Sequence, residues 1–410
     1  MPDSPAPIAL RARWVFPVAG PPLADACVTI AGGRIVAVGA PVSDGPVQDL
    51  GSVAIVPGLI NAHTHLEFSG IQRPLGSPGM PLPDWIRRVI AERRAADAPA
   101  ENIREGLAEC LSTGTTAVGE IATSDWRALV DGRQPRVVMF REAIAPRQAR
   151  VPSALATIDE FLQASSSNQQ VSRALSPHAP YTVHRDLLVG LIERSIARQL
   201  PLAMHLAESP EELELLATGA GPFRELLVDL DAWEDDPQAR YRTCREYLEQ
   251  LSRAPRALVI HGNYLNDAEQ AFLAAHRATM SVVYCPRTHA YFCHAAYPLA
   301  QMLSAGVQVA LGTDSRASNP DLNLLAEMKH VVCAHPAVDP QTVLELGTLA
   351  GARALGVDSL RGTIEPGKVA DLGVVAINGA GQGGDPHELL FAEDAQVVET
   401  ILAGERQASS

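Results

Sequence analysis

Two histidines separated by one residue end an apolar run, and their type and spacing are the first sign of chemistry in the chain. The run LINAHTH begins at Leu59 and carries His63 and His65. Alternate residues of a β-strand point to the same side, so both imidazoles can face one cavity. Neutral imidazole is a common ligand of divalent metal ions. The pair therefore predicts one corner of a metal site, although two histidines at this spacing also occur by chance.

Five further polar residues follow later apolar runs of the same kind. They are His178 in SPHAPY, His205 and Glu208 in MHLAES, His261 in VIHGN and Asp314 in LGTDS. A histidine satisfied within the core, or an aspartate that caps a helix, would explain any one of them alone. The C-terminal ends of barrel strands converge on one site. Taken together, the five residues therefore predict a shared cavity that also contains the histidine pair.

The middle of the chain has the pattern of elements that would bring these residues together. From about residue 57 to 355, apolar runs such as TTAVGEIA and RVVMFREA alternate with amphipathic stretches such as HRDLLVGLIERSIARQ. This alternation predicts a parallel α/β sheet, and the eightfold count favours a closed (β/α)₈ barrel. Segment 219–256 is rich in charge and proline and interrupts the alternation. We expect it to be an inserted helical segment over the barrel mouth.

The two ends of the chain have a different character from the middle. Residues from about 8 to 56 read as short β pieces separated by glycine, proline and aspartate, and the segment after residue 360 repeats this character. One small sheet domain built from both termini is the simplest arrangement. We predict a composite domain of residues 1–56 and 360–410 and a barrel domain of residues 57–359.

Composition excludes several classes of protein. The chain has 410 residues, of which 47% are hydrophobic and 20% charged, as in soluble globular proteins with a sizeable core. A formal net charge of −14 argues against a nucleic-acid partner. No secretory signal pattern and no apolar run of about 18 residues is present, so we expect no membrane partner and a cytoplasmic location. The six cysteines are scattered and form no C-x-x-C pair, which argues against a thiolate zinc site.

Seven motifs spread along nearly the whole chain resemble those of the amidohydrolase superfamily, in its cytosine, guanine and adenosine-type deaminase and chlorohydrolase branch. They are PGLINAHTHLEFSG, SPHAPYT, MHLAES, VIHGNYL, CPRTHAYF, LGTDSRASNPDLNLLAEM and GTIEPGKVADLGVV. The resemblance implies a distorted TIM (β/α)₈ barrel and a small β-sandwich domain formed by both termini. It also implies one divalent metal ion, for which zinc is the first choice and iron the alternative.

The resemblance assigns a role to each residue at the strand ends. The implied metal ligands are His63, His65, His205 and Asp314. His261 matches the histidine that steers the attacking water or polarises the substrate, and Glu208 matches the acid that shuttles protons. In a deaminase, Asp314 would take a proton from the attacking water and Glu208 would protonate the ring nitrogen before ammonia leaves.

Lysine usage bears on the number of metal ions. Binuclear relatives bridge two metal ions with a carbamylated lysine on a middle strand of the barrel. Lys329 and Lys368 are the only lysines of this chain, and both lie after Asp314. A single metal ion is therefore expected from the sequence as well as from the resemblance.

Four residues are candidates for substrate binding. His178 resembles the substrate-contacting histidine of nucleoside deaminases in this branch. Arg287 and His289 lie in CPRTHAYF, where the seventh barrel strand should end. A guanidinium there suits a substrate carboxylate or phosphate, and a structural salt bridge is the equal alternative. Glu67 would face the same side as His65 if the strand continued, and would bind substrate or orient a ligand.

The first functional hypothesis is hydrolytic deamination of an aminated purine-like heterocycle or nucleoside. Within the family, HTHLEFSG, CPRTHAYF and GTDSRASN look similar to aminodeoxyfutalosine deaminase-like members, which makes that nucleoside a candidate substrate. A second hypothesis is hydrolysis of an amide or a chlorinated triazine, which Glu208 disfavours because its proton delivery suits deamination. A third is a barrel that has lost catalysis. The resemblance further implies a small-molecule substrate and a homodimer.

Overall fold

The middle of the chain forms a barrel of eight parallel strands whose spatial order follows the sequence. The structure is a computed structural model, and it describes residues 7–41, 45–95, 99–165, 168–378 and 385–407. The barrel strands are β6 (Leu59–Thr64), β7 (Thr115–Ala122), β8 (Arg136–Ala143), β9 (Val171–Pro177), β10 (Leu202–Leu206), β11 (Ala257–His261), β12 (Met280–Tyr284) and β13 (Val309–Leu311). The predicted eight-stranded α/β barrel is confirmed.

The first and last barrel strands meet beside the histidine pair. Thr64 and Asp314 form a parallel bridge, and the backbone N–H of Asp314 donates to the carbonyl oxygen of His63 at 3.1 Å. A Cβ added at Gly312 would come within 2.9 Å of that carbonyl oxygen. A residue with a side chain would therefore push the two strand ends apart where the barrel closes.

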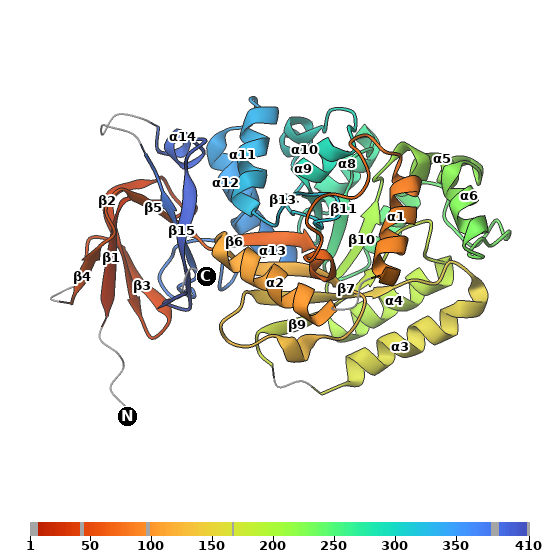
Figure 1. The fold of residues 1–410 in the computed structure, drawn as a ribbon, viewed down its shortest axis with the longest axis horizontal. Coiled ribbons are helices and arrows are strands. Elements are labelled where there is room, and N and C mark those ends of the chain that lie inside the picture. Colours follow the sequence, from red (N-terminus) through yellow and green to blue (C-terminus); the bar gives the residue numbers. More distant parts are fainter. Residues whose placement is uncertain (1–6, 42–44, 96–98, 166–167, 379–384, 408–410) are drawn as a thin grey trace.

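Helices surround the barrel (Figure 1). They are α1 (Leu82–Ala95), α2 (Pro99–Ser112), α3 (Val151–Gln163), α4 (Arg185–Arg198), α5 (Pro210–Thr218), α6 (Pro222–Asp229), α7 (Cys244–Leu251), α8 (Asp267–Ala275), α9 (Pro286–Tyr291), α10 (Leu299–Ala305), α11 (Leu324–Ala334), α12 (Pro340–Leu346), α13 (Leu349–Leu355) and α14 (Pro386–Leu390). Polar residues fix where several of them begin. The Ser209 hydroxyl accepts the N–H of Glu212 at the start of α5, and Asn266 forms a capping box with Glu269 at the start of α8.

The termini build one mixed sheet beside the barrel, where Figure 1 shows red N-terminal and blue C-terminal strands together. Its strands are β1 (Ile8–Val15), β2 (Leu23–Ala31), β3 (Arg34–Gly39), β4 (Val47–Asp49), β5 (Val53–Pro57), β14 (Leu372–Ala376), β15 (Gln396–Leu402) and β16 (Glu405–Arg406). The antiparallel pairing of β5 with β14 joins the two ends of the chain. The predicted domain built from both termini is confirmed, while the boundaries at 57 and 360 stay a prediction.

The interrupted segment 219–256 contains α6 and α7, as predicted for a helical insertion. Leu226 and Leu227 of α6, with Leu230 and Ala232 after it, line the cavity at the barrel mouth. The insertion therefore covers the same strand ends that carry the polar residues. In the part of the chain that the structure describes, no helix is both long enough and apolar enough to cross a bilayer.

Candidate metal and substrate site

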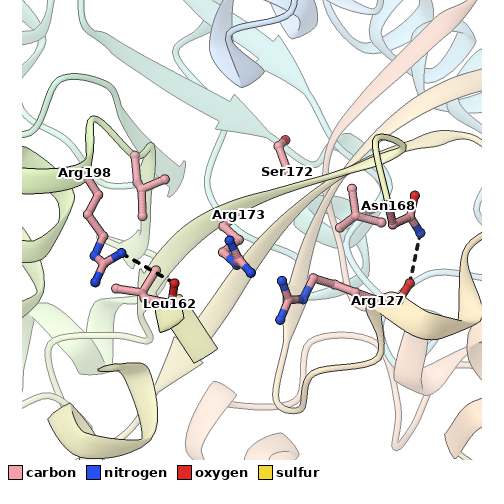
Figure 2. Close-up of a pocket in the computed structure, with 8 residues that line it drawn as sticks. Arg127, Leu162, Asn168, Ser172, Arg173 and Arg198 are labelled. Carbon is pink, nitrogen blue, oxygen red and sulfur yellow. Dashed lines mark hydrogen bonds between the residues drawn. The ribbon is translucent and has the colours of Figure 1, made fainter. Parts of the chain in front are cut away.

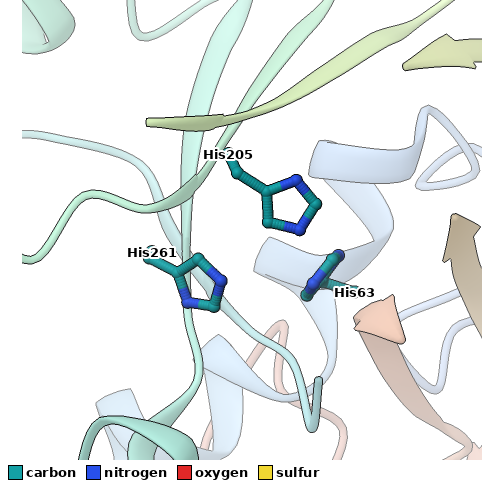
Figure 3. A group of neighbouring side chains, drawn as sticks. All are labelled: His63, His205 and His261. Carbon is teal, nitrogen blue, oxygen red and sulfur yellow. The ribbon is translucent and has the colours of Figure 1, made fainter. Parts of the chain in front are cut away.

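Histidines from different strands gather at the C-terminal end of the barrel. Figure 3 shows His63 of β6, His205 of β10 and His261 of β11 with their rings around one space. Each of the three offers a ring nitrogen within 4.8 Å of the other two, and His63, His65 and Asp314 form a second group of this kind. Because both groups contain His63, all five residues surround one centre. His261, predicted to act on water or substrate, thus also lies within reach of a metal ion.

The chemistry of these residues fits a bound divalent cation. Both ring nitrogens of His63 are buried, and neither has a hydrogen-bond partner among the described residues. The Nε2 atoms of His63 and His65 lie 3.5 and 3.6 Å from Oδ1 of Asp314. Burial holds the pKa of His63 and His65 well below the usual value, and that of His205 at about 4. Neutral imidazoles around a carboxylate, with no thiolate, suit zinc or iron.

Backbone contacts hold the cluster in place. His205 Nδ1 lies 3.0 Å from the carbonyl oxygen of His178, which leaves its Nε2 for the centre. The Ser318 hydroxyl donates to Oδ2 of Asp314 at 3.0 Å. His261 has a φ of 67° and Asp314 a φ of 58°, in the left-handed region that residues other than glycine rarely adopt. The Tyr297 hydroxyl donates to the His261 carbonyl oxygen at 3.0 Å and so stabilises this conformation.

Glu208 follows β10 and points into the same centre. Its carboxyl lies 3.5 Å from Nε2 of His261, and its side chain is 8% exposed. Burial first, and then the nearby Asp314 carboxylate, raise its pKa well above the usual range. The segment is fixed by Glu212, which accepts the backbone N–H groups of Ala207 and Glu208. The structure therefore places a protonatable carboxyl beside the histidine cluster, where the sequence predicted an acid.

A cavity of about 250 Å³ opens onto this centre and extends toward the insertion. Its polar lining residues are His65, Arg93, Glu142, His178, Thr182, His205, Glu208, His261, Asp314 and Ser315. The remaining wall is largely apolar and comes from α1 and from the segment around α6. An apolar cavity with a few convergent polar groups is typical of a small-molecule site.

His178 lies at the cavity wall, and its role as a substrate contact stays a prediction. Its Nδ1 is 2.6 Å from the Thr182 hydroxyl, which donates to the Ala179 carbonyl oxygen. We assign the ring proton to Nδ1 for this reason, since the hydroxyl proton is already used. Burial, and then the charge of Arg93, lower the pKa of His178 to about 4. The ring is therefore neutral and its Nε2 is a free acceptor.

Two of the predicted substrate-binding residues lie outside the lining of this cavity. Arg287 forms ion pairs with Glu327, Nε to Oε1 at 2.6 Å, and with Asp321 at 2.5 Å. Its guanidinium is thus used inside the protein, which is the salt-bridge alternative. His289 packs against the rings of Tyr284, His294 and Tyr297. Both belong to α9, because the chain turns into a helix directly after β12.

Glu67 also lies outside the lining. Its carboxylate accepts the hydroxyl and the backbone N–H of Thr123 and pairs with Arg93 at 3.2 Å. Strand β6 ends at Thr64 and Leu66–Phe68 form a 3₁₀ turn, so Glu67 leaves the face of His65. It holds the guanidinium of Arg93 at the cavity wall instead. Sequence reasoning overlooked Arg93 and Glu142, because one charged residue in a helix or strand carries no motif.

A second hollow lies at the opposite end of the barrel strands, near the start of β9 (Figure 2). Three arginines line it, and protein groups occupy each of them. Arg127 makes a two-point ion pair with Asp125, while Arg173 and Arg198 donate to the carbonyl oxygens of residues 164 and 162 at the end of α3. Cations at a helix C-terminus are stabilising. This hollow is therefore explained by the packing of α3.

The fold is a (β/α)₈ barrel, and histidines and an aspartate lie at the C-terminal ends of its strands. This is the architecture of a metal-dependent hydrolase. The sequence profile of the amidohydrolase family matches residues 54–406. The chain therefore belongs to the amidohydrolase family.

Known relatives of this chain include nucleoside deaminases. It is 30% identical to a 5-methylthioadenosine/S-adenosylhomocysteine deaminase of Nitratidesulfovibrio vulgaris, over 93% of this chain and 87% of the relative. It is 28% identical to an aminodeoxyfutalosine deaminase of Deinococcus radiodurans, over 75% of each protein.

Two solved structures share the fold. An adenosine deaminase from Xanthomonas campestris with bound zinc has a TM-score of 0.77 and 25% identity, covering 99% of this chain and 93% of its own. Aminofutalosine deaminase of Helicobacter pylori, in complex with methylthio-coformycin, has a TM-score of 0.85 at 24% identity, with 98% and 100% covered. The second likeness supports the fold alone.

Proposed function

We propose that the protein is a metal-dependent hydrolytic deaminase that releases ammonia from an adenine-type nucleoside. The observation that carries the proposal is the meeting of the histidine cluster, the Glu208 carboxyl and the neutral His178 ring in one cavity. Hydrolytic deamination needs a group that activates water and a second group that protonates the ring nitrogen. In this proposal the histidine cluster with Asp314 supplies the first group and Glu208 the second, and they come from separate strand ends.

We propose His63, His65, His205 and Asp314 as the ligands of one zinc ion. A divalent ion bound there would act as a Lewis acid and lower the pKa of the attacking water toward neutrality. Asp314 would accept one proton from the attacking water, while the Ser318 hydroxyl donates to its other carboxylate oxygen. His261 orients the water. A single ion also agrees with the two lysines, which donate to backbone carbonyl oxygens outside the cavity.

Glu208 delivers the proton that deamination requires. Addition of the water oxygen to the ring carbon, with protonation of the ring nitrogen by the acid form of Glu208, gives a tetrahedral carbon that carries hydroxyl and amino groups. The Glu208 carboxylate then takes the proton of this hydroxyl as the carbonyl forms, and the amino group leaves as ammonia with the proton that Asp314 took from the water. The buried position of Glu208 beside His261 is the support for this role.

The nucleoside class follows from the cavity and from the relatives. The relatives named above act on 5-methylthioadenosine, S-adenosylhomocysteine or aminodeoxyfutalosine by their names. The apolar wall formed by Trp85, Ile86 and Ile90 of α1 and by Leu226 and Leu227 of α6 suits an uncharged 5′ substituent. Among the described residues that line the cavity, Arg93 is the only lysine or arginine, and it is already paired with Glu67. We therefore propose nucleosides rather than nucleotides as substrates.

An ammonia-release screen tests the proposed function. Zinc-loaded protein would be incubated with adenosine, 5′-methylthioadenosine, S-adenosylhomocysteine, aminodeoxyfutalosine and guanine, with a chlorinated triazine as the chlorohydrolase arm. Release of ammonia from at least one of the nucleosides is the expected result. Chloride release alone, or no product with fully loaded protein, would refute the proposal. Elemental analysis of the same sample reports the identity of the metal and its ratio to protein.

Two further features of the protein belong to the proposal. We propose a homodimer, which light scattering during size-exclusion chromatography would test against a chain mass of 43.6 kDa. We also propose the cytoplasm as its compartment, because all six cysteines are free thiols, as expected under reducing conditions.

A further inference from the structure

Glu142 is a buried carboxylate that the chemistry proposed above does not use. It lies near the end of β8, lines the cavity, and has a side chain that is only 6% exposed. No described residue donates a hydrogen bond to its carboxylate. Its nearest polar neighbour is Nε2 of His178, at 3.9 Å from Oε1, which is too far for a hydrogen bond.

The pair of Glu142 and His178 presents two acceptors and no donor. The proton of His178 is on Nδ1, where the Thr182 hydroxyl accepts it, so Nε2 faces the carboxylate as a second lone pair. Two buried acceptors that face each other without a donor are unfavourable unless a bound molecule supplies donors. The geometry therefore favours a ligand that carries hydrogen-bond donors at this position.

The charge of Arg93 indicates which kind of hydrogen-bond donor on a ligand would fit this position. The guanidinium of Arg93 is held at the same wall by Glu67 and lies over the Phe68 ring. Burial raises the pKa of Glu142 and lowers that of His178, and the positive charge of Arg93 acts to lower both, so it favours an ionised carboxylate beside a neutral ring. A second cation, such as a substrate ammonium, would be repelled there. A neutral group with two adjacent donors fits better, and a carboxylate accepts two hydroxyl groups side by side.

We propose that Glu142 binds the 2′- and 3′-hydroxyl groups of the substrate ribose and thereby determines preference for ribonucleosides. The inference rests on the proposed nucleoside deamination and adds the residue that reads the sugar. Glu142 is not one of the candidate metal ligands or proton-transfer groups. Its loss therefore affects sugar recognition and leaves the reaction at the base intact.

The test combines one substitution in the protein with removal of the two hydroxyl groups from the sugar. Rates would be measured for adenosine and 2′,3′-dideoxyadenosine with the wild-type protein and with Glu142→Gln. We expect the wild type to prefer adenosine about 10- to 100-fold in kcat/KM, the range of a hydrogen bond to a charged group. Glu142→Gln should lose most of this factor on adenosine while the dideoxynucleoside changes less than about twofold. Asp229→Asn is the matched control, because it removes an exposed carboxylate of α6 that pairs with Arg87 and lies outside the cavity lining.

Three results would overturn the inference. The first is an equal loss on both nucleosides in Glu142→Gln, which indicates a structural or catalytic role. The second is an unchanged preference for adenosine in this variant. The third is a loss confined to S-adenosylhomocysteine relative to 5′-methylthioadenosine, which indicates an ammonium contact. Calorimetric binding of adenosine and its dideoxy analogue, measured in proteins that also carry Glu208→Gln to slow turnover, gives the corresponding ratio, so failure of deamination and failure of the sugar contact are separate outcomes.

Discussion

Replacement of Arg287 by methionine decides between a structural and a substrate-binding role for this arginine. Glu327 is fully buried and accepts from Arg287 Nε at 2.6 Å, from the backbone N–H of residue 287 at 2.9 Å and from Asn319 Nδ2 at 2.6 Å. Removal of one partner of a buried ion pair costs about 3–5 kcal/mol. Because Glu327 keeps two donors in the variant, we expect a loss near the lower end, about 3 kcal/mol.

Urea unfolding of the metal-loaded protein and steady-state kinetics on the folded protein measure the two roles separately. The free energy of unfolding should fall by the amount above, while KM for the nucleoside stays within about twofold of wild type. The double variant Arg287→Met with Glu327→Leu is the control. It replaces both charges by apolar groups and should recover most of the stability. A tenfold rise in KM with unchanged unfolding would refute the structural role.

Three further predictions concern the centre and its supports. Glu208→Gln should lower kcat about 10²- to 10⁴-fold with unchanged metal content; equal activity in the two proteins would contradict its role as the acid. Tyr297→Phe removes the hydrogen bond to the His261 carbonyl oxygen and should lower kcat about fivefold, the equivalent of about 1 kcal/mol, at constant KM; a change in unfolding alone would point to packing only. Burial raises the pKa of Glu212 from 4.5 to about 7, so the folded protein keeps a proton that the unfolded chain releases. Stability contributed by this group is therefore present below about pH 4.5 and is lost as the pH rises to about 7. Urea titrations at intervals across this range should show the decline, and Glu212→Gln should show a flatter profile if the assignment holds.

The part of the site that was predictable from the sequence lies directly at strand ends. His63, His205 and His261 each end or nearly end a short apolar run, and alternation of such runs with helices specifies a parallel barrel. Convergence then follows from the fold, because all strands of a parallel barrel present the same end to one site. The local sequence pattern was therefore sufficient to predict where these three residues lie.

The residues that sequence reasoning misplaced depend on partners far away in the chain. Arg287 finds its carboxylate 40 residues later in Glu327, and a motif around Arg287 contains no sign of that partner. Glu67 leaves the face of His65 because the strand ends and a 3₁₀ turn begins. Glu142 could not be singled out, since an acidic residue near the end of a strand is ordinary until the absence of its partners is known.

The backbone at three strand ends adopts a left-handed conformation that could not be predicted from the residue types. Ala207, His261 and Asp314 follow or end β10, β11 and β13, and all three have φ between 55° and 67°. Each non-glycine residue in this region costs about 1–2 kcal/mol, so glycine would be the stable choice. At 261 and 314 glycine would remove the side chain that faces the centre, and the strain is instead balanced by bonds such as the Thr64 hydroxyl to the Asp314 carbonyl oxygen at 3.1 Å. The same left-handed conformation occurs at or after the ends of three barrel strands, and at two of them the residue carries the imidazole or carboxylate of the histidine cluster. Strain at these positions is thus a physical reason to place the reacting centre there, independent of any motif.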